Sequence, residues 1–99
     1  MSFQIRTTRL FLDQVKKLGK ESRKLIGSKI DLVKENPYRF KRIHSKRFLR
    51  AFRVRLSLEG KETRLIYAVI KPNIIIACLL ERKNDYRDLE KMLAIALRN

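Results

Sequence analysis

Three arginines have the spacing needed to act together on a phosphate group. Arg53 and Arg55 alternate with apolar residues in the segment 52–59, a pattern typical of a half-buried strand. A two-residue turn at Glu59–Gly60 would place Arg55 opposite Arg64, and opposed residues share one face of a sheet. Two like charges in such a pair are destabilising in an empty site, whereas a phosphate between them would relieve that cost. The spacing therefore predicts an anion site.

This arrangement depends on the length of the turn. With two residues in the turn, Leu58 faces Lys61 and Arg53 faces Ile66. A longer turn would move Arg64 to the other face or to the edge, because side chains alternate along a strand and a one-residue slip reverses them. Both alternatives stay open at the level of the sequence.

Cationic residues also gather outside these strands. The chain of 99 residues has 25 Lys or Arg and 10 Asp or Glu, so its formal net charge is +15. Between Glu35 and Glu59 there is no acid, whereas eight Lys or Arg residues and His44 lie there. Solubility alone does not require such an exclusion of acids, so a polyanionic partner is favoured over a merely solvated basic loop.

Several other chemistries lack the residues that they need. One Cys and one His cannot build a four-ligand zinc site, and Cys78 lies in an apolar run typical of a core. There is no glycine-rich nucleotide loop, and no nucleophile signature accompanies His44. No segment is long and apolar enough for a membrane span. Arg6 and Arg9 interrupt the apolar stretch that an N-terminal signal peptide would need. We expect one cytoplasmic domain over residues 1–99, without a metal, a cofactor or a membrane partner.

The periodicity of apolar residues predicts the elements that position the arginines. Two helices followed by a three-strand meander indicate an α+β fold, with both helices on one face of a small antiparallel sheet and the other face open. The expected order is β-α-α-β-β-β-α: a strand near Phe3–Arg6, a helix from Thr7 or Thr8 to Gly19, a helix over 21–35 ended by Asn36-Pro37, strands over 52–59, 63–70 and 74–80, and a helix from Asp85 to about Leu97.

At Arg64-Leu65-Ile66-Tyr67 the chain resembles the RelE/ParE superfamily of toxins from toxin–antitoxin systems, and specifically its RelE-like mRNA interferase branch. The resemblance covers nearly the whole chain and includes the segments Glu35-Asn36-Pro37, Phe52–Leu56 and Arg82–Tyr86. It implies a ribosome-dependent, metal-independent endoribonuclease that cleaves mRNA by attack of a 2′-OH on the adjacent phosphate. The implied partners are mRNA, the ribosome and a cognate acidic antitoxin, which forms a heteromeric complex with the toxin.

The resemblance also implies a role for each matching residue. Arg53 and Arg55 fall at basic positions that hold and orient the phosphate, and Arg64 at the arginine that stabilises the charge developing on it. Arg82 falls at a residue that assists the leaving 5′-oxygen, and Tyr86 at a tyrosine proposed as general base. The other cations predicted to hold RNA phosphates are Lys46, Arg47 and Arg50.

Several of these residues also have a simpler, purely structural interpretation. Tyr86 follows Arg82 by four residues, a closer spacing than in some active members, and Tyr86 would otherwise be a tyrosine packed on the sheet. Arg82 would otherwise be a strand-end charge in water. His44 is either a proton-transfer group or a loop residue that contacts RNA or nothing. Phe40, Phe48 and Phe52 could stack on bases, although core positions are favoured, for Phe52 especially.

Two further functions fit the same fold. One is a non-catalytic ParE-like toxin that inhibits DNA gyrase, a branch that tends to lack the set Arg64, Arg82 and Tyr86. The other is a catalytically decayed member that only binds RNA or ribosomes through its basic face. Cleavage of mRNA would separate the first interpretation from both of these.

Overall fold

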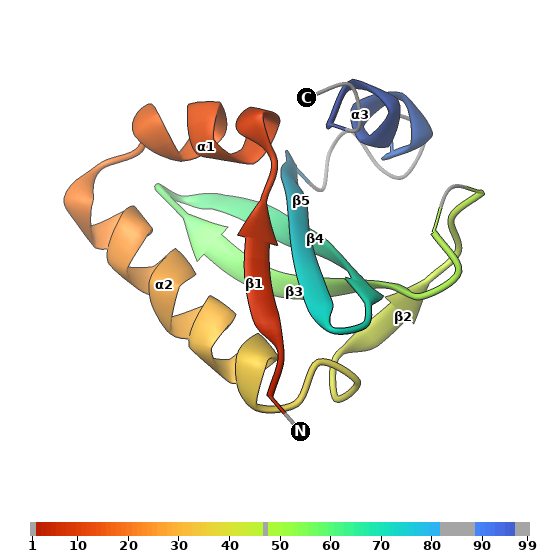
Figure 1. Ribbon diagram of the computed structural model, residues 1–99. Helices are drawn as coiled ribbons and strands as arrows, with labels where there is room; N and C mark the ends of the chain where they lie inside the picture. Colours follow the sequence, from red (N-terminus) through yellow and green to blue (C-terminus); the bar gives the residue numbers. More distant parts are fainter. Residues whose placement is uncertain (1, 47, 82–88, 97–99) are drawn as a thin grey trace.

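A computed structural model describes residues 2–46, 48–81 and 89–96 (Figure 1). Their strands and helices follow in this order: β1 (Gln4–Thr7), α1 (Arg9–Lys16), α2 (Lys20–Glu35), β2 (Lys41–Ile43), β3 (Ala51–Leu58), β4 (Lys61–Ile70), β5 (Asn73–Glu81) and α3 (Leu89–Ala96). The strands form one sheet in the order β1-β5-β4-β3-β2. Helices α1 and α2 lie on one side of the sheet, which we call the helix side, and α3 lies on the other (Figure 1). The expected α+β class is confirmed.

The two N-terminal helices form where their caps and apolar spacing predict them. The hydroxyl of Thr8 caps α1 by accepting a hydrogen bond from the Phe11 N–H at 3.1 Å. Helix α1 ends at Lys16, before the predicted end at Gly19, because Gly19 instead occupies the N-cap position of α2. Helix α2 ends before Asn36–Pro37 as expected, since proline disfavours helical geometry in the residue before it.

A residue of the β3–β4 turn caps the N-terminus of α2. The Glu59 carboxylate accepts hydrogen bonds from the Gly19 N–H at 2.9 Å and from the Ser22 hydroxyl at 3.3 Å. A carboxylate at this end of a helix satisfies an unpaired N–H and interacts favourably with the helix dipole. Glu59 and Gly60 have φ values of 50° and 80°, the positive values that a two-residue hairpin turn of this type requires. The turn is thereby tied to α2.

The register of β3 and β4 is the one predicted for a two-residue turn. Arg55 pairs with Arg64, and Arg53 pairs with Ile66. Because paired residues share a face and alternate residues of a strand share a face, Arg53, Arg55 and Arg64 lie on the same side of the sheet. The alternative with a longer turn is wrong.

The sheet differs in two respects from the antiparallel meander that we expected. Strand β1 pairs in parallel with β5, with Ile5 opposite Ile74, so the sheet is mixed. No hairpin joins these two strands, so no tight turn dictates that they run in opposite directions. Strand β2 is additional and pairs with the outer edge of β3, whose N–H and C=O groups need partners. Its three residues are too few to show a period of two.

A hydrophobic core lies on each side of the sheet. The larger core, on the helix side, contains Phe11, Ile26, Val33, Phe52, Val54, Leu56, Leu65, Tyr67, Ile74 and Ile76 among others. The smaller core, on the opposite side, contains Phe48, Ala51, Ile66, Ala68, Ala77, Cys78, Leu80 and Leu89. The core positions expected for Phe52 and Cys78 are confirmed.

The face that we expected to be open is therefore partly covered. Phe48, from the loop after β2, and Leu89, at the start of α3, pack there against Ile66, Cys78 and other apolar residues. Such residues are unfavourable in contact with water, which is the physical reason for the cover. Helix α3 lies within the range predicted for the last helix, whereas its predicted start at Asp85 lies outside the described residues.

Candidate functional site

Arg53, Arg55 and Arg64, which we call the arginine cluster, lie on the side of the sheet opposite α1 and α2. Arg55 and Arg64 occupy opposed positions on β3 and β4, and Arg53 is two residues from Arg55 on β3. Arg53 and Arg64 are only 7% and 8% exposed, whereas Arg55 is exposed. Arginine is seldom buried so far without a partner, and both buried arginines interact with other groups in the folded chain. The structure therefore holds two guanidinium groups in place and leaves the third accessible.

A small pocket lies beside the Arg55–Arg64 pair. Its volume is about 230 Å³, well above the roughly 10–15 Å³ that a cavity needs to hold one water, so it has room for a phosphate group. Its lining residues are Arg55, Leu56, Ser57, Glu62, Thr63 and Arg64.

Glu62 is a candidate that the sequence analysis missed. Its side chain is exposed, lines this pocket and, two residues before Arg64, belongs to the same face of β4. A carboxylate here can oppose the charges of the neighbouring guanidinium groups, and it can accept a proton. The period of two along β4 would have been enough to identify it.

A larger pocket, which we call the β2 pocket, lies beside Arg53. Its volume is about 450 Å³, and its lining residues are Lys41, Arg42, Ile43, His44, Lys46, Arg53, Leu89 and Glu90. Lys41 of β2 pairs with Arg53, so cationic residues continue across the sheet from β4 to β2. The Lys46 backbone N–H donates a hydrogen bond to Glu90 Oε1 at 2.8 Å, which joins the loop after β2 to α3. The predicted residues Lys46 and His44 thus come together with Arg53.

Arg50 does not join the arginine cluster. Its guanidinium carbon lies 5.8 Å from the centre of the Tyr38 ring, and Tyr38 packs edge-to-face against Phe52 at 6.0 Å. Because Phe52 belongs to the core on the helix side, Arg50 is directed away from Arg53. The predicted site residues Arg47, Arg82 and Tyr86 lie outside the described residues.

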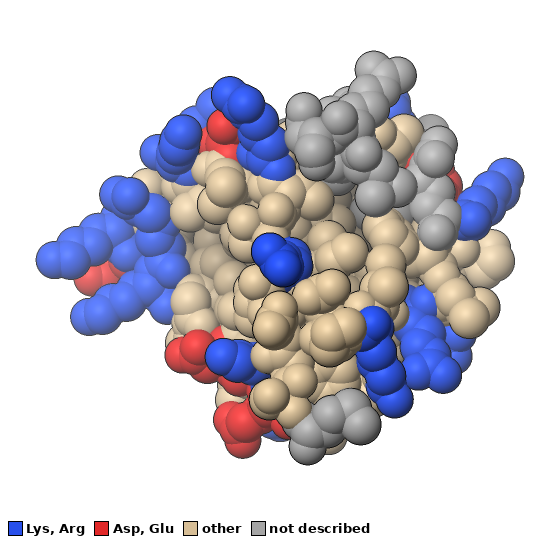
Figure 2. Space-filling model, viewed as in Figure 1, with Lys and Arg blue, Asp and Glu red and all other residues tan. Residues whose placement is uncertain are grey.

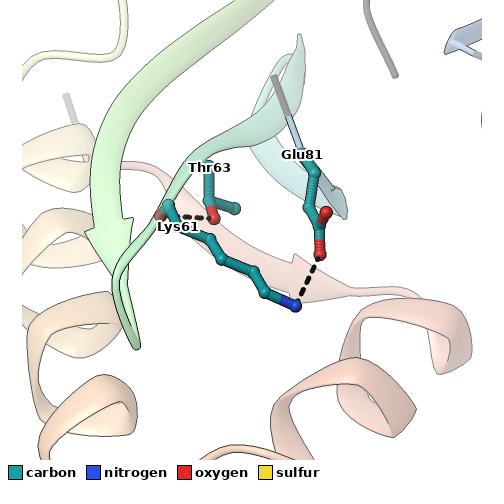
Figure 3. Close-up of polar contacts among 3 residues, drawn as sticks. All are labelled: Lys61, Thr63 and Glu81. Carbon is teal, nitrogen blue, oxygen red and sulfur yellow. Dashed lines mark hydrogen bonds and ion pairs between the residues drawn. The ribbon is translucent and has the colours of Figure 1, made fainter. Parts of the chain in front are cut away.

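An ion pair holds the end of β5 against β4 (Figure 3). Lys61 Nζ lies 3.7 Å from Glu81 Oε1, and the Thr63 hydroxyl donates a hydrogen bond to the Lys61 carbonyl at 3.2 Å. The Lys61 and Glu81 side chains are 65% and 35% exposed, so the pair contributes at most about 1 kcal/mol to stability. Arg82 directly follows Glu81 in the sequence, so this ion pair ends one residue before a predicted site residue.

The two tyrosines that the structure describes are not placed to act at the arginine cluster. Burial raises the pKa of Tyr67 above its ordinary value, and its hydroxyl donates a hydrogen bond to the Pro37 carbonyl at 2.5 Å. Tyr67 and Tyr38 both pack on the helix side, against Phe52. Among the residues that line the smaller pocket, Glu62 is therefore the group suited to accept a proton.

Positive charge is spread over two regions of the surface. Basic side chains gather over α1 and its junction with α2, and again around β2, with a nearly uncharged band between them over β1 and β5 (Figure 2). Exposed cations in the first region are Arg9, Lys16, Lys17, Lys20, Arg23 and Lys24. In the part of the chain that the structure describes, no group of His, Cys, Asp and Glu is arranged to hold a metal ion. None of the helices described there is long and apolar enough to cross a membrane.

The fold and the position of the arginine cluster define the class of architecture: a RelE-like α+β fold. The structure is similar to that of the E. coli toxin RelE, solved in the free state as a mutant with two arginines replaced by alanine. The TM-score is 0.69 at 18% identity, over 99% of this chain and 97% of the RelE chain. A scan against protein-family models and a search of curated proteins found no match. The resemblance to RelE is thus confirmed at the level of the fold.

Proposed function

We propose that the protein is a RelE-like toxin, an endoribonuclease that cleaves mRNA on the ribosome without a metal ion. The observation that supports this most is the Arg55–Arg64 pair beside its pocket, on a fold shared with the E. coli toxin RelE. Guanidinium groups on two opposed residues can contact one phosphodiester through charge-assisted hydrogen bonds, and their forked geometry matches that of a phosphate. The pair is therefore suited to bind a phosphate.

The bonds that form and break in the proposed reaction belong to the RNA, and side chains of this chain supply the catalytic groups. The ribose 2′-OH attacks the adjacent phosphorus, the bond to the 5′-oxygen breaks, and the products are a 2′,3′-cyclic phosphate and a 5′-OH. Catalysis requires alignment, stabilisation of the added negative charge, a base and an acid. In our proposal Arg53 and Arg55 hold the phosphate, Arg64 stabilises the developing charge, Arg82 assists the leaving oxygen and Tyr86 is a candidate base.

Glu62 is a second candidate for the base. It lines the same pocket as Arg55 and Arg64, and an ionised carboxylate accepts a proton directly. A tyrosine hydroxyl must first lose its own proton, which ordinarily requires a pH near 10. Comparison of Glu62→Gln with Tyr86→Phe distinguishes the two, since each substitution removes the base and keeps the shape of the side chain. The variant with the larger loss of cleavage rate identifies the base.

The central experiment is induction of the chain alone, followed by mapping of mRNA ends in a translating extract. Arg64→Ala should reduce the cleavage rate by about two to three powers of ten, because one preorganised donor to the transition state is lost. Ribosome binding should remain, since Arg53 and Arg55 still hold the phosphate in the ground state. Arg53→Ala should instead weaken binding and rate together.

Two controls make this experiment decisive. Because Arg64 is buried, thermal unfolding of Arg64→Ala is measured in parallel, and Arg64→Lys tests the guanidinium while keeping the charge. Normal cleavage by a folded Arg64→Ala variant would show that the site is not at the arginine cluster. Inhibition of DNA gyrase without mRNA cleavage would support the ParE-like alternative, and ribosome binding without either activity would support a decayed member.

A further inference from the structure

The β2 pocket has the size and the lining of a nucleotide site. Its volume of about 450 Å³ lies within the range of roughly 300–1,000 Å³ usual for small-molecule sites. Lys41, Lys46 and Arg53 provide cations around it, and Ile43 and Leu89 provide apolar surface. A nucleotide combines an anionic phosphate with a flat base that packs against apolar groups, and this pocket offers both kinds of contact.

The pocket also has the right position relative to the proposed site of cleavage. Arg53 lines the β2 pocket, and Arg55 lines the smaller pocket together with Arg64. Arg53 and Arg55 are two residues apart on one strand, a separation of about 7 Å along β3. An RNA strand with one phosphate between Arg55 and Arg64 therefore has a neighbouring nucleotide within reach of the β2 pocket.

We propose that the β2 pocket is a nucleotide subsite that receives a nucleotide next to the cleaved bond. Lys41 holds its phosphate, beside the cleaved phosphate that Arg53 and Arg55 hold, and its base packs against Ile43 and Leu89. The identity of the ligand as RNA rests on the proposed function above, whereas the volume and the lining of the pocket do not depend on it.

Glu90 is placed to discriminate between nucleobases. Its Oε1 accepts the hydrogen bond from the Lys46 N–H, so its carboxylate is fixed at the wall of the pocket. Carboxylates accept hydrogen bonds from exocyclic amino groups, which adenine, cytosine and guanine carry and uracil lacks. We therefore expect uridine monophosphate to bind more weakly than the other three ribonucleoside monophosphates.

The test uses the full chain and five probes: the four ribonucleoside 5′-monophosphates and inorganic phosphate. Binding is followed by chemical-shift changes of backbone amides, which are expected to centre on the residues that line the β2 pocket. Lys41→Ala should weaken nucleotide binding about tenfold through the loss of one charge-assisted contact. The matched control is Lys24→Ala, an exposed cation on α2, which should leave the affinity unchanged. Both lysines are exposed, so neither substitution threatens the fold.

Four results would overturn the subsite. These are equal affinity for inorganic phosphate and nucleotides, shifts centred on α1 and α2, unchanged affinity in Lys41→Ala, and tighter binding of a Glu-rich peptide that displaces the nucleotides. The last result would assign the pocket to an acidic protein partner. The binding test does not require catalysis, so a chain that binds nucleotides here without cleaving mRNA contradicts only the proposed function. Cleavage of mRNA without nucleotide binding at this pocket contradicts only the subsite.

Discussion

At the scale of single residues, burial divides the arginine cluster into two kinds of group. Arg53 and Arg64 are less than one-tenth exposed, so folding has already restricted their side chains. Binding a phosphate to them costs little further side-chain entropy, which is the condition for effective electrostatic stabilisation. Arg55 is exposed and loses its freedom only when it binds. We therefore expect Arg55 to contribute to capture of the phosphate and Arg64 to contribute to the rate.

Cys78 makes the stability of the core depend on pH above neutrality. Burial raises the pKa of its thiol from an ordinary value of 9.0 to about 12. Between these values the unfolded chain has lost a proton that the folded chain retains, so the free energy of unfolding falls as the pH rises. At pH 10 the effect amounts to about 1 kcal/mol.

Urea unfolding of the wild type and of Cys78→Ala, each at pH 8 and pH 10, measures this effect. The wild type should lose about 1 kcal/mol more than the variant between the two pH values. The comparison cancels the pH dependence that the two proteins share, including that of the buried Tyr67 hydroxyl. An equal loss in both proteins would mean that Cys78 is accessible to water in the folded state.

At the scale of elements, Glu59 couples the strands of the arginine cluster to the helices. Its carboxylate contacts Gly19 and Ser22 at the start of α2, although it lies in the turn between β3 and β4. A non-glycine residue with a φ of 50° is conformationally strained, and these contacts offset the strain. The turn that sets the register of Arg55 and Arg64 is thus held from outside the sheet.

We expect Glu59→Gln to lower the free energy of unfolding by about 1 kcal/mol, because the helix cap loses its charge. Denaturant unfolding of Glu59→Ala, Ser22→Ala and the double variant then measures the coupling between the two residues. A coupling energy of at least about 0.5 kcal/mol is expected for groups in direct contact. Additive effects would show that the contact with Ser22 contributes nothing to stability.

Some of these elements could be predicted from the sequence because their signals are local. The alternation along β3 and a two-residue turn at Glu59–Gly60 predict Arg55 opposite Arg64, and the structure excludes the longer turn that the sequence left open. Strand β2 could not be predicted, because three residues without alternation form a strand only when the edge of β3 is beside them. The β2 pocket was missed for the same reason, since it exists only where β2 and α3 come together.

At the scale of the whole molecule, the net charge of +15 makes binding to a polyanion depend on salt. Each phosphate that a single-stranded RNA contributes lowers log K by about 0.7 for a tenfold rise in salt concentration. Four such contacts would lower log K by about 2.8 over that range. Filter binding of ribosomes or RNA at several salt concentrations measures the slope. Binding that does not respond to salt would contradict an electrostatic interface.

The same charge leads us to expect an acidic protein partner. The edge strands β1 and β2 offer backbone groups for pairing, and basic side chains lie around β2 (Figure 2). We expect an acidic, partly disordered antitoxin segment to cover the arginine cluster or to displace α3. Purification from the native host should recover a small acidic protein with this chain. Recovery of the chain alone, with no gene for an acidic protein beside its own, would count against the toxin proposal.

The parallel pairing of β1 with β5 also determines when the protein can complete its fold. Strand β5 lies between β1 and β4 in the sheet, and β1 pairs with the sheet through it. Ribosomes add about 5–20 residues per second, so the 74 residues from Thr7 to Glu81 take roughly 4–15 s to synthesise. Until β5 is synthesised β1 has no partner strand, and β4, once synthesised, has an unpaired edge. A protein that we propose to attack messages under translation thus remains incomplete while most of its own message is being translated.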